Sequence, residues 1–192
     1  SFVDAQIGLI FDKLKAQKLW NDTIVIFTSD HGYHLGEHFM WGKVTLFEEC
    51  ARVPLIVRVP GVSPLGKTSQ GLVETIDLFP TLAELCGLTA PAQLQGKSYV
   101  SLIRKPGGPG KPSAYTVVSR GTQLGRSIRT QRWRYAEWGE AKAAELYDLQ
   151  RDTREYTNLA KSPQHRNIVR QMKSRLAKRQ AQAESARSGT DK

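Results

Sequence analysis

The sequence has few cysteines and no long apolar run. Only Cys50 and Cys86 occur among 192 residues, too few for a disulfide framework and without the spacing of a zinc site. No apolar stretch approaches the roughly 20 residues of a membrane-spanning helix, and no signal peptide is visible. These residues therefore predict neither a membrane span nor a disulfide scaffold. The content of 40% hydrophobic and 24% charged residues is ordinary for a globular chain.

The first residues are apolar at helical spacing, from Val3 to Leu14, with no methionine before them. We therefore expect the natural protein to begin upstream, and any targeting segment to lie there. A parallel expectation concerns the other end of the chain, where the last dozen residues, 181–192, are predicted to be disordered.

The net charge of +10 is concentrated near the C-terminus. From Arg151 to Lys192 there are eleven Lys or Arg and four Asp or Glu. A basic segment can bind nucleic acid, an anionic membrane or an acidic glycan. The charges are not interleaved with aromatic residues, as stacking on bases would require, so we expect a solvated helix face and no nucleic-acid partner.

Residues 1–103 have the pattern of an α/β domain. The opening helix is followed by an apolar, β-branched run, Thr23–Ser29, which predicts a strand buried on both faces and, with the helix, a parallel sheet. A second apolar strand is expected over Val53–Val59. Asp77 is expected to cap a helix that Gly87 ends.

The composition changes at residues 104–113, a Pro/Gly-rich segment that predicts a linker. Residues 114–180 then form the second expected unit, a small antiparallel sheet followed by a helix that begins near Ser162-Pro163. Short alternating segments separated by turn residues predict its strands: Tyr115–Ser119, Gly125–Thr130, Trp133–Trp138 and Glu145–Leu149.

The chemistry is concentrated in residues 29–43, which hold three histidines, two carboxylates, a lysine and three glycines. Asp30 follows the first predicted strand, and in open parallel sheets ligands bind at that carboxyl edge. A carboxylate there suits a hard divalent cation, and His31 could add a nitrogen ligand. Lys43 offers a compact cation for an anionic substrate. A simple turn capped by Asp30 is the alternative.

Four ordered motifs resemble the formylglycine-dependent sulfatases, closest to the iduronate-2-sulfatase-like and choline-sulfatase-like branches. The resemblance covers about residues 1–160. The motifs are Ser29-Asp30-His31-Gly32-Tyr33-His34-Leu35-Gly36-Glu37-His38 with Trp41-Gly42-Lys43; Val73-Glu74-Thr75-Ile76-Asp77-Leu78-Phe79-Pro80; Gln95-Gly96-Lys97-Ser98; and Glu145-Leu146-Tyr147-Asp148-Leu149 with Asp152, Glu155 and Asn158.

The resemblance implies an alkaline-phosphatase-like α/β domain with a mostly parallel sheet, followed by the small antiparallel subdomain and its helix. It implies a metal, usually Ca²⁺, held partly by Asp30 and His31, and a catalytic contact of Lys43 with the sulfate group. His34 and His38 are common in this branch and are candidates for substrate binding.

The family nucleophile is absent from this sequence. It is formylglycine, made from the first residue of Cys/Ser-x-Pro-Ser-Arg, and neither Cys50 nor Cys86 is followed by that pattern. The family's paired N-terminal aspartates are absent too. The chain alone is therefore expected to be inactive and to need the missing N-terminal part of the same protein as its partner.

The resemblance thus implies part of a sulfuric ester hydrolase that acts on sulfate monoesters of carbohydrates or small alcohols. Relatives of this kind are periplasmic or secreted, or lysosomal in eukaryotes. Two alternatives stay open: a phosphoester or phosphonate hydrolase of the alkaline phosphatase superfamily, and a non-catalytic module that binds acidic glycans through the basic tail.

Overall fold

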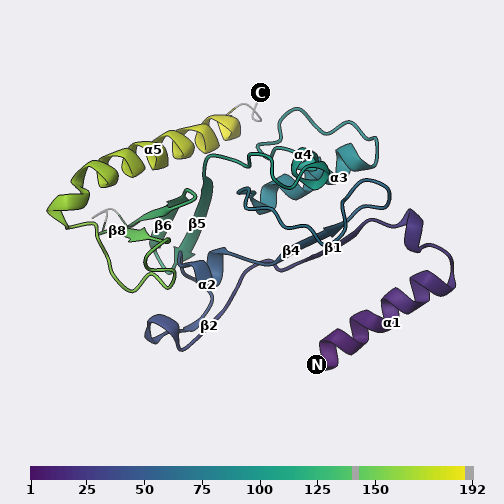
Figure 1. Cartoon of the computed structure of the whole chain (residues 1–192). Coiled ribbons are helices and arrows are strands. Elements are labelled where there is room, and N and C mark those ends of the chain that lie inside the picture. Colours follow the sequence, from purple (N-terminus) through teal and green to yellow (C-terminus); the bar gives the residue numbers. More distant parts are fainter. Residues whose placement is uncertain (140–142, 189–192) are drawn as a thin grey trace.

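The computed structural model describes residues 1–139 and 143–188. The first half contains a two-stranded ribbon with helices, and the second half contains a four-stranded sheet with a long helix on one face (Figure 1). The elements of the first half are α1 (Phe2–Ala16), a 3₁₀ turn (Trp20–Asp22), β1 (Val25–Thr28), β2 (His34–Leu35), a 3₁₀ turn (Glu37–Phe39), β3 (Trp41–Gly42), α2 (Glu48–Ala51), β4 (Leu55–Arg58), a 3₁₀ turn (Thr75–Asp77), α3 (Leu78–Leu85) and α4 (Val100–Arg104).

Strands β1 and β4 pair antiparallel, with Val25 opposite Arg58 and Thr28 opposite Leu55. This corrects the parallel pairing expected from the helix–strand pattern. A parallel pair needs a crossover that carries the chain back to the starting end, usually through a long helix. Here the connection contains a small hairpin and the four-residue helix α2, and the chain simply returns beside β1 in the opposite direction.

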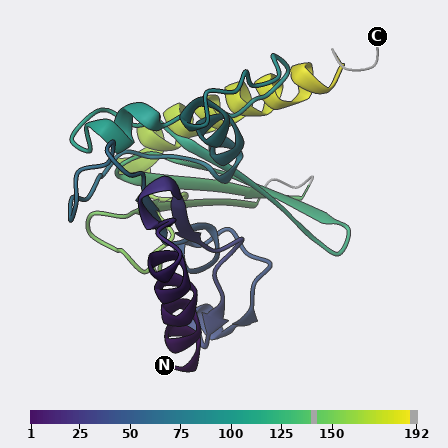
Figure 2. The same cartoon turned by 90° about the vertical axis from the view of Figure 1, so that its right-hand side faces the viewer.

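The same ribbon is not buried on both faces, which corrects a second expectation. One side packs against α3 and α4, where Val57 and Val59 contact a cluster that includes Tyr99 and Ile103. On the ribbon, Phe27 remains 43% exposed and Ile56 remains 63% exposed. In both views no described helix or strand lies against this open side (Figures 1 and 2). The apolar run that predicts a buried strand therefore lies at the surface of this chain.

Helix α1 is likewise uncovered. It extends away from the rest of the molecule (Figure 1), and none of its residues is buried. Its apolar residues face solvent, with Phe2 79% and Ile10 61% exposed. An amphipathic helix normally buries its apolar stripe against another element, so these side chains lack the cover that their pattern predicts.

The second half matches the sequence prediction closely. The sheet has the order β5-β6-β7-β8, with every neighbouring pair antiparallel. Its core is formed where one face of the sheet meets α5, and the buried side chains are Ile128, Tyr135, Leu146, Met172 and Leu176. Its elements are β5 (Ala114–Arg120), β6 (Gln123–Arg129), β7 (Trp133–Trp138), β8 (Ala143–Asp148), a 3₁₀ turn (Pro163–His165) and α5 (Arg166–Ser188).

The expected disorder of residues 181–192 is wrong as far as Ser188, because α5 continues to that residue. Residues 181–188 include three Ala, one Gln, one Glu and one Arg, all of high helix propensity. Gln180 also donates to Glu184 one turn later, at 2.9 Å. Residues 189–192 lie outside the described part of the chain.

Buried charges join the two halves. Glu74 pairs with Lys111 and with Arg179 of α5, and it accepts a hydrogen bond from the backbone of Tyr115 at 2.8 Å. Lys111 also reaches Asp77 at 2.5 Å. Asp77 does not cap α3 with its side chain; its carboxylate accepts from the backbone amides of Glu74 and Lys97. Residues 105–113 contain no helix or strand beyond one isolated bridge.

Candidate functional site

The loop of residues 29–47 leaves the carboxyl end of β1 and contains the β2–β3 hairpin. This hairpin lies on the side of the molecule away from α5 (Figures 1 and 2). His34 pairs with Gly42 and Leu35 with Trp41. Continued by one residue, this register places Lys43 opposite Tyr33. The hairpin therefore returns Lys43 to the end of the loop from which Asp30 and His31 emerge.

Asp30 and His31 form a paired donor set at the end of β1. Asp30 Oδ1 accepts the backbone N–H of His31 at 3.0 Å, and Oδ2 lies 3.4 Å from His31 Nε2. The backbone N–H of His31 holds the pKa of Asp30 below its usual value. His31 Nδ1 lies 2.9 Å from the carbonyl of Gly32. A carbonyl can only accept, so Nδ1 is the donor in this hydrogen bond, and Nε2 is the ring nitrogen that faces the Asp30 carboxylate.

This donor set fits one side of a divalent-cation site. The Asp30 side chain is 83% exposed, so its oxygens are accessible, and an imidazole nitrogen, a common metal ligand, lies beside it. Within residues 1–139 and 143–188, no group of three or more His, Cys, Asp or Glu side chains is arranged to hold a metal. Any ion bound by Asp30 and His31 would therefore need further ligands from elsewhere.

Gly32 fixes this corner of the loop against α2. Its backbone N–H donates to the carbonyl of Cys50 at 2.9 Å. A Cβ at Gly32 would lie 1.8 Å from the carbonyl oxygen of Glu49, so no side chain fits there. The backbone of Asp30-His31-Gly32 is consequently held in register with α2.

Lys43 is exposed, and its side chain forms no ion pair within the described residues. Its backbone carbonyl accepts from Thr45 N at 3.0 Å, and Thr45 is buried. The ammonium is thus accessible from solvent, while the backbone beneath it is anchored. Its contact with a sulfate group stays a prediction, because nothing in the chain marks where a substrate would lie.

His34 and His38 have mainly internal contacts. His34 is 0% exposed, and its Nε2 lies 2.7 Å from Thr45 Oγ1. His38 stacks on Phe47 with a centroid distance of 3.8 Å, and its Nε2 lies 3.7 Å from Glu49 Oε2. His38 also adopts a left-handed φ of 54°. These contacts shape the loop, and the predicted role in substrate binding remains untested.

A buried charge cluster that the sequence did not predict lies under the loop. Arg134 of β7 is 2% exposed, and its Nε lies 2.6 Å from Glu155 Oε1, while its guanidinium also pairs with Glu48 of α2. Glu48 also has a longer contact, of 3.9 Å, with the exposed Arg52. The only local signal for Glu155 is its place in the C-terminal motif. Nothing in the sequence around Arg134 marks it as part of this cluster, because its partner Glu48 lies 86 residues away.

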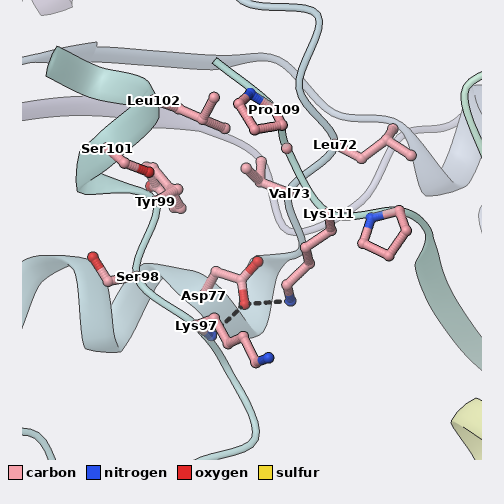
Figure 3. Close-up of a pocket in the computed structure, with 12 residues that line it drawn as sticks. Leu72, Val73, Asp77, Lys97, Ser98, Tyr99, Ser101, Leu102, Pro109 and Lys111 are labelled. Carbon is pink, nitrogen blue, oxygen red and sulfur yellow. Dashed lines mark hydrogen bonds and ion pairs between the residues drawn. The ribbon is translucent and has the colours of Figure 1, made fainter. Parts of the chain in front are cut away.

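The cavities of the chain lie away from this loop. One of about 270 Å³ lies between α4 and the 109–112 segment, and there Asp77 accepts from Lys97 and pairs with Lys111 (Figure 3). The other, of about 540 Å³, is lined by Arg58 and Pro60 with neighbours. Neither of these two cavities is lined by any residue from 29 to 47.

Comparison with known proteins identifies relatives over most of the chain. A family model described as N-sulphoglucosamine sulphohydrolase, C-terminal, matches residues 36–182. A sulfatase of Formosa agariphila is 33% identical over 181 residues, covering 94% of this chain. Choline-sulfatase of Rhizobium meliloti is 34% identical over 170 residues, covering 85%. Human iduronate 2-sulfatase is 32% identical and covers 72%. The chain spans about a third of these relatives, 35%, 32% and 36% of their lengths.

Solved structures also include proteins similar to this chain over most of its length. A protein in complex with its substrate, D-glucosamine-2-N,6-O-disulfate, superposes with a TM-score of 0.90 at 28% identity, covering 95% of this chain and 39% of that one. The phosphonate monoester hydrolase of Agrobacterium radiobacter superposes with a TM-score of 0.84 at 30% identity, covering 94% and 39%. These superpositions confirm the expected fold class. No described helix is both long and apolar enough to cross a bilayer.

Proposed function

Because the chain belongs to the sulfatase family and corresponds to its C-terminal region, we propose that it is part of an enzyme that hydrolyses sulfate monoesters. In that enzyme it supplies metal ligands and a cation for the sulfate group. The observation that supports the proposal is the loop of residues 29–47, in which Asp30 and His31 pair at the end of β1 and the β2–β3 hairpin precedes Lys43.

Asp30 and His31 would hold a divalent cation, for which Ca²⁺ is the expected ion. The depressed pKa of Asp30 keeps the carboxylate ionised and ready to bind at neutral pH. When bound, such an ion draws negative charge away from the sulfate oxygens. The Gly32 carbonyl accepts from His31 Nδ1, so Nε2 is the ring nitrogen that would face the ion.

Lys43 would stabilise the negative charge that develops as the S–O bond breaks. Preorganised cations directed at developing charge are among the largest contributors to catalysis. The exposed ammonium of Lys43 on an anchored backbone meets that requirement. Its long side chain allows it to follow the sulfate oxygens during the reaction.

The nucleophile is proposed to lie outside these residues. Formylglycine is expected from an upstream Cys or Ser, and Cys50 is unsuited to the role because it is buried beneath the hairpin, with Sγ 3.8 Å from the Gly42 carbonyl. The chain alone is therefore proposed to be inactive. We also propose, from the family resemblance, that the complete protein is periplasmic or secreted, or lysosomal if eukaryotic.

The N-terminal part of the protein is the proposed partner of this chain. Relatives are about three times as long. The apolar side chains of α1 and the open side of the β1–β4 ribbon, including Phe2, Ile10, Phe27 and Ile56, are the surface that it would cover. Upstream ligands would then reach Asp30 at the carboxyl end of β1.

A sulfated carbohydrate is the proposed substrate. Support comes from relatives named for carbohydrate sulfates, among them a Δ4,5-hexuronate-2-O-sulfatase and an N-acetylglucosamine-6-O-sulfatase of Bacteroides thetaiotaomicron. The alternative, phosphonate ester hydrolysis, is supported by the likeness to the phosphonate monoester hydrolase and to a multifunctional alkaline phosphatase superfamily protein of Trinickia caryophylli.

The test is substrate preference in the full-length protein. Rates on a sulfated glucosamine and on a phosphonate monoester should differ in favour of the sulfate. Asp30→Ala should lower the sulfate rate by roughly 10²-fold or more, because it removes a metal ligand, and should leave the melting temperature in metal-free buffer unchanged. A higher rate on the phosphonate would transfer the assignment to the alternative class.

A further inference from the structure

We infer that Glu155 and Arg134, both outside the site loop, are positioning residues that set the placement of Asp30, His31 and Lys43. The inference rests on the proposed function, because it assigns those three residues to the reaction. Neither positioning residue would touch substrate or metal; each acts through α2 and the backbone of the loop.

Glu155 and Arg134 are both buried, and the backbone of Glu155 is strained. Glu155 is 1% exposed, and its backbone has a left-handed φ of 57°, which a non-glycine residue rarely adopts. Arg134 is 2% exposed on the sheet face opposite α5. Strained backbone and buried charge persist where surrounding contacts require them, and here those contacts are to the loop.

Their contacts hold the N-terminal end of α2. Glu155 Oε2 accepts the backbone N–H of Glu48. Arg134 donates to the backbone carbonyl of Leu46 at 2.7 Å and pairs with the Glu48 carboxylate, which Arg129 also approaches at 3.5 Å. One carboxylate and one guanidinium from the C-terminal subdomain thus hold Leu46 and Glu48, the residues on either side of Phe47.

Two short backbone connections join the N-terminal end of α2 to the proposed site, one through Gly32 and the other through Thr45. The carbonyl of Cys50, in α2, accepts from Gly32 N, and Gly32 admits no side chain. A shift of α2 therefore displaces His31. On the other side, Leu46 follows Thr45, whose hydroxyl lies 2.7 Å from His34 Nε2 and whose N–H reaches Lys43.

A matched control exists in the same subdomain. Asp148 pairs with Arg132 at 2.9 and 2.7 Å, and it is 3% exposed. Like Glu155 it is a buried carboxylate of the C-terminal motif that holds an arginine. Its recorded partners, Arg132, Arg151 and Gln150, lie within its own subdomain. Replacing it disturbs the subdomain without releasing α2.

The experiment compares Glu155→Ala and Asp148→Ala in the full-length protein. Three quantities are measured for each: sulfate-ester kcat, the rise in melting temperature on adding Ca²⁺, and amide hydrogen exchange of peptides covering residues 30–34 and 44–50. Glu155→Ala should lower kcat by roughly 10-fold or more, reduce the Ca²⁺-induced rise, and speed exchange in both peptides. Asp148→Ala should change none of these three, although it lowers the metal-free melting temperature.

Glu155→Gln provides a conservative variant that keeps an oxygen for the Glu48 N–H, and it should restore slow exchange at residues 44–50. The inference is overturned if the two alanine variants lose the same melting temperature and also behave alike in kcat, Ca²⁺ response and exchange. It falls together with the proposed function if the wild-type protein neither hydrolyses sulfate esters nor responds to Ca²⁺. The wild-type measurement therefore separates the two failures.

Discussion

The two halves of the chain differ in how completely they bury their own apolar residues. The C-terminal subdomain encloses a core in which Ile128 and Leu146 are fully buried. In the N-terminal half, α1 buries nothing and the β1–β4 ribbon exposes Phe27 and Ile56. Helix α1 and the β1–β4 ribbon have the apolar pattern of buried elements. The described residues do not include elements that cover their apolar side chains. Hydrophobic pattern therefore predicted burial correctly only where both packing partners lie within these residues.

The largest expected effect is a loss of turnover without a loss of stability, and it concerns the site loop. Lys43→Ala in the full-length protein should lower turnover by roughly 10²- to 10³-fold, because it removes a preorganised cation at the developing charge. Its stability should hold, since the side chain is exposed and unpaired within the described residues. Lys67→Ala, at another exposed lysine, is the control. Near-normal rates with Lys43→Ala would remove this lysine from the site.

The second effect tests the contrast between the halves directly. Ile128→Ala should cost about 2–5 kcal/mol in the full-length protein, because it leaves a cavity in a closed core. Ile56→Ala should cost a comparable amount if upstream residues cover the ribbon, and under about 0.5 kcal/mol if the ribbon stays open. Urea unfolding of both variants measures the difference. A negligible cost at Ile56 would contradict the proposed cover.

A smaller effect comes from Glu155 and depends on pH. Burial raises the pKa of Glu155 to about 7 from 4.5, the carboxylates of Glu48 and Glu49 add to the rise, and Arg134 with the Glu48 N–H opposes it. The folded protein then holds the proton more tightly than the unfolded chain. Its free energy of unfolding should fall, on the order of 1–3 kcal/mol, as pH rises from about 4.5 to about 7.

The measurement is the melting temperature across that pH range in the wild type and in Glu155→Gln, which cannot ionise. The variant should show a flatter profile between pH 4.5 and 7. Equal slopes in the two proteins would assign the pH dependence to other groups.

The smallest effect is expected on the basic face of α5. Lys173 and Lys178 are exposed, while Met172 and Leu176 of the same helix are buried in the core. Replacing both lysines with Gln should change turnover on a sulfated monosaccharide by less than about twofold, as is usual for solvated charges. A large loss of binding to an acidic polysaccharide would favour the glycan-binding alternative. Deleting the helix would be a poor test, because it would open the core.

The sequence predicted the subdomain and the site loop for identifiable reasons. Alternating strands bounded by turn residues such as Gly121 and Gly139 located all four strands of the sheet. The density of ionisable residues between Ser29 and Lys43 pointed to the loop, in which Asp30 and His31 lie 3.4 Å apart, and their role as metal ligands stays a prediction.

The remainder could not be predicted because it depends on contacts between distant residues. In an alternating strand, Arg134 occupies a position that would face solvent, yet it is buried beneath the loop. Glu155 reaches Glu48 across 107 residues, and no local pattern records such a contact. The antiparallel pairing of β1 with β4 depends in the same way on how the intervening loop folds, which hydrophobic periodicity does not encode.

The two-stranded ribbon has a consequence for handling the polypeptide. In the described part of the chain, β1 and β4 each have a single neighbour, so each carries one outer edge of unpaired backbone donors and acceptors beside exposed apolar side chains. Such edges recruit strands from other molecules. If these residues are expressed without the upstream portion, they should aggregate at rising concentration, and charged substitutions at Phe27 or Ile56 should keep them dispersed.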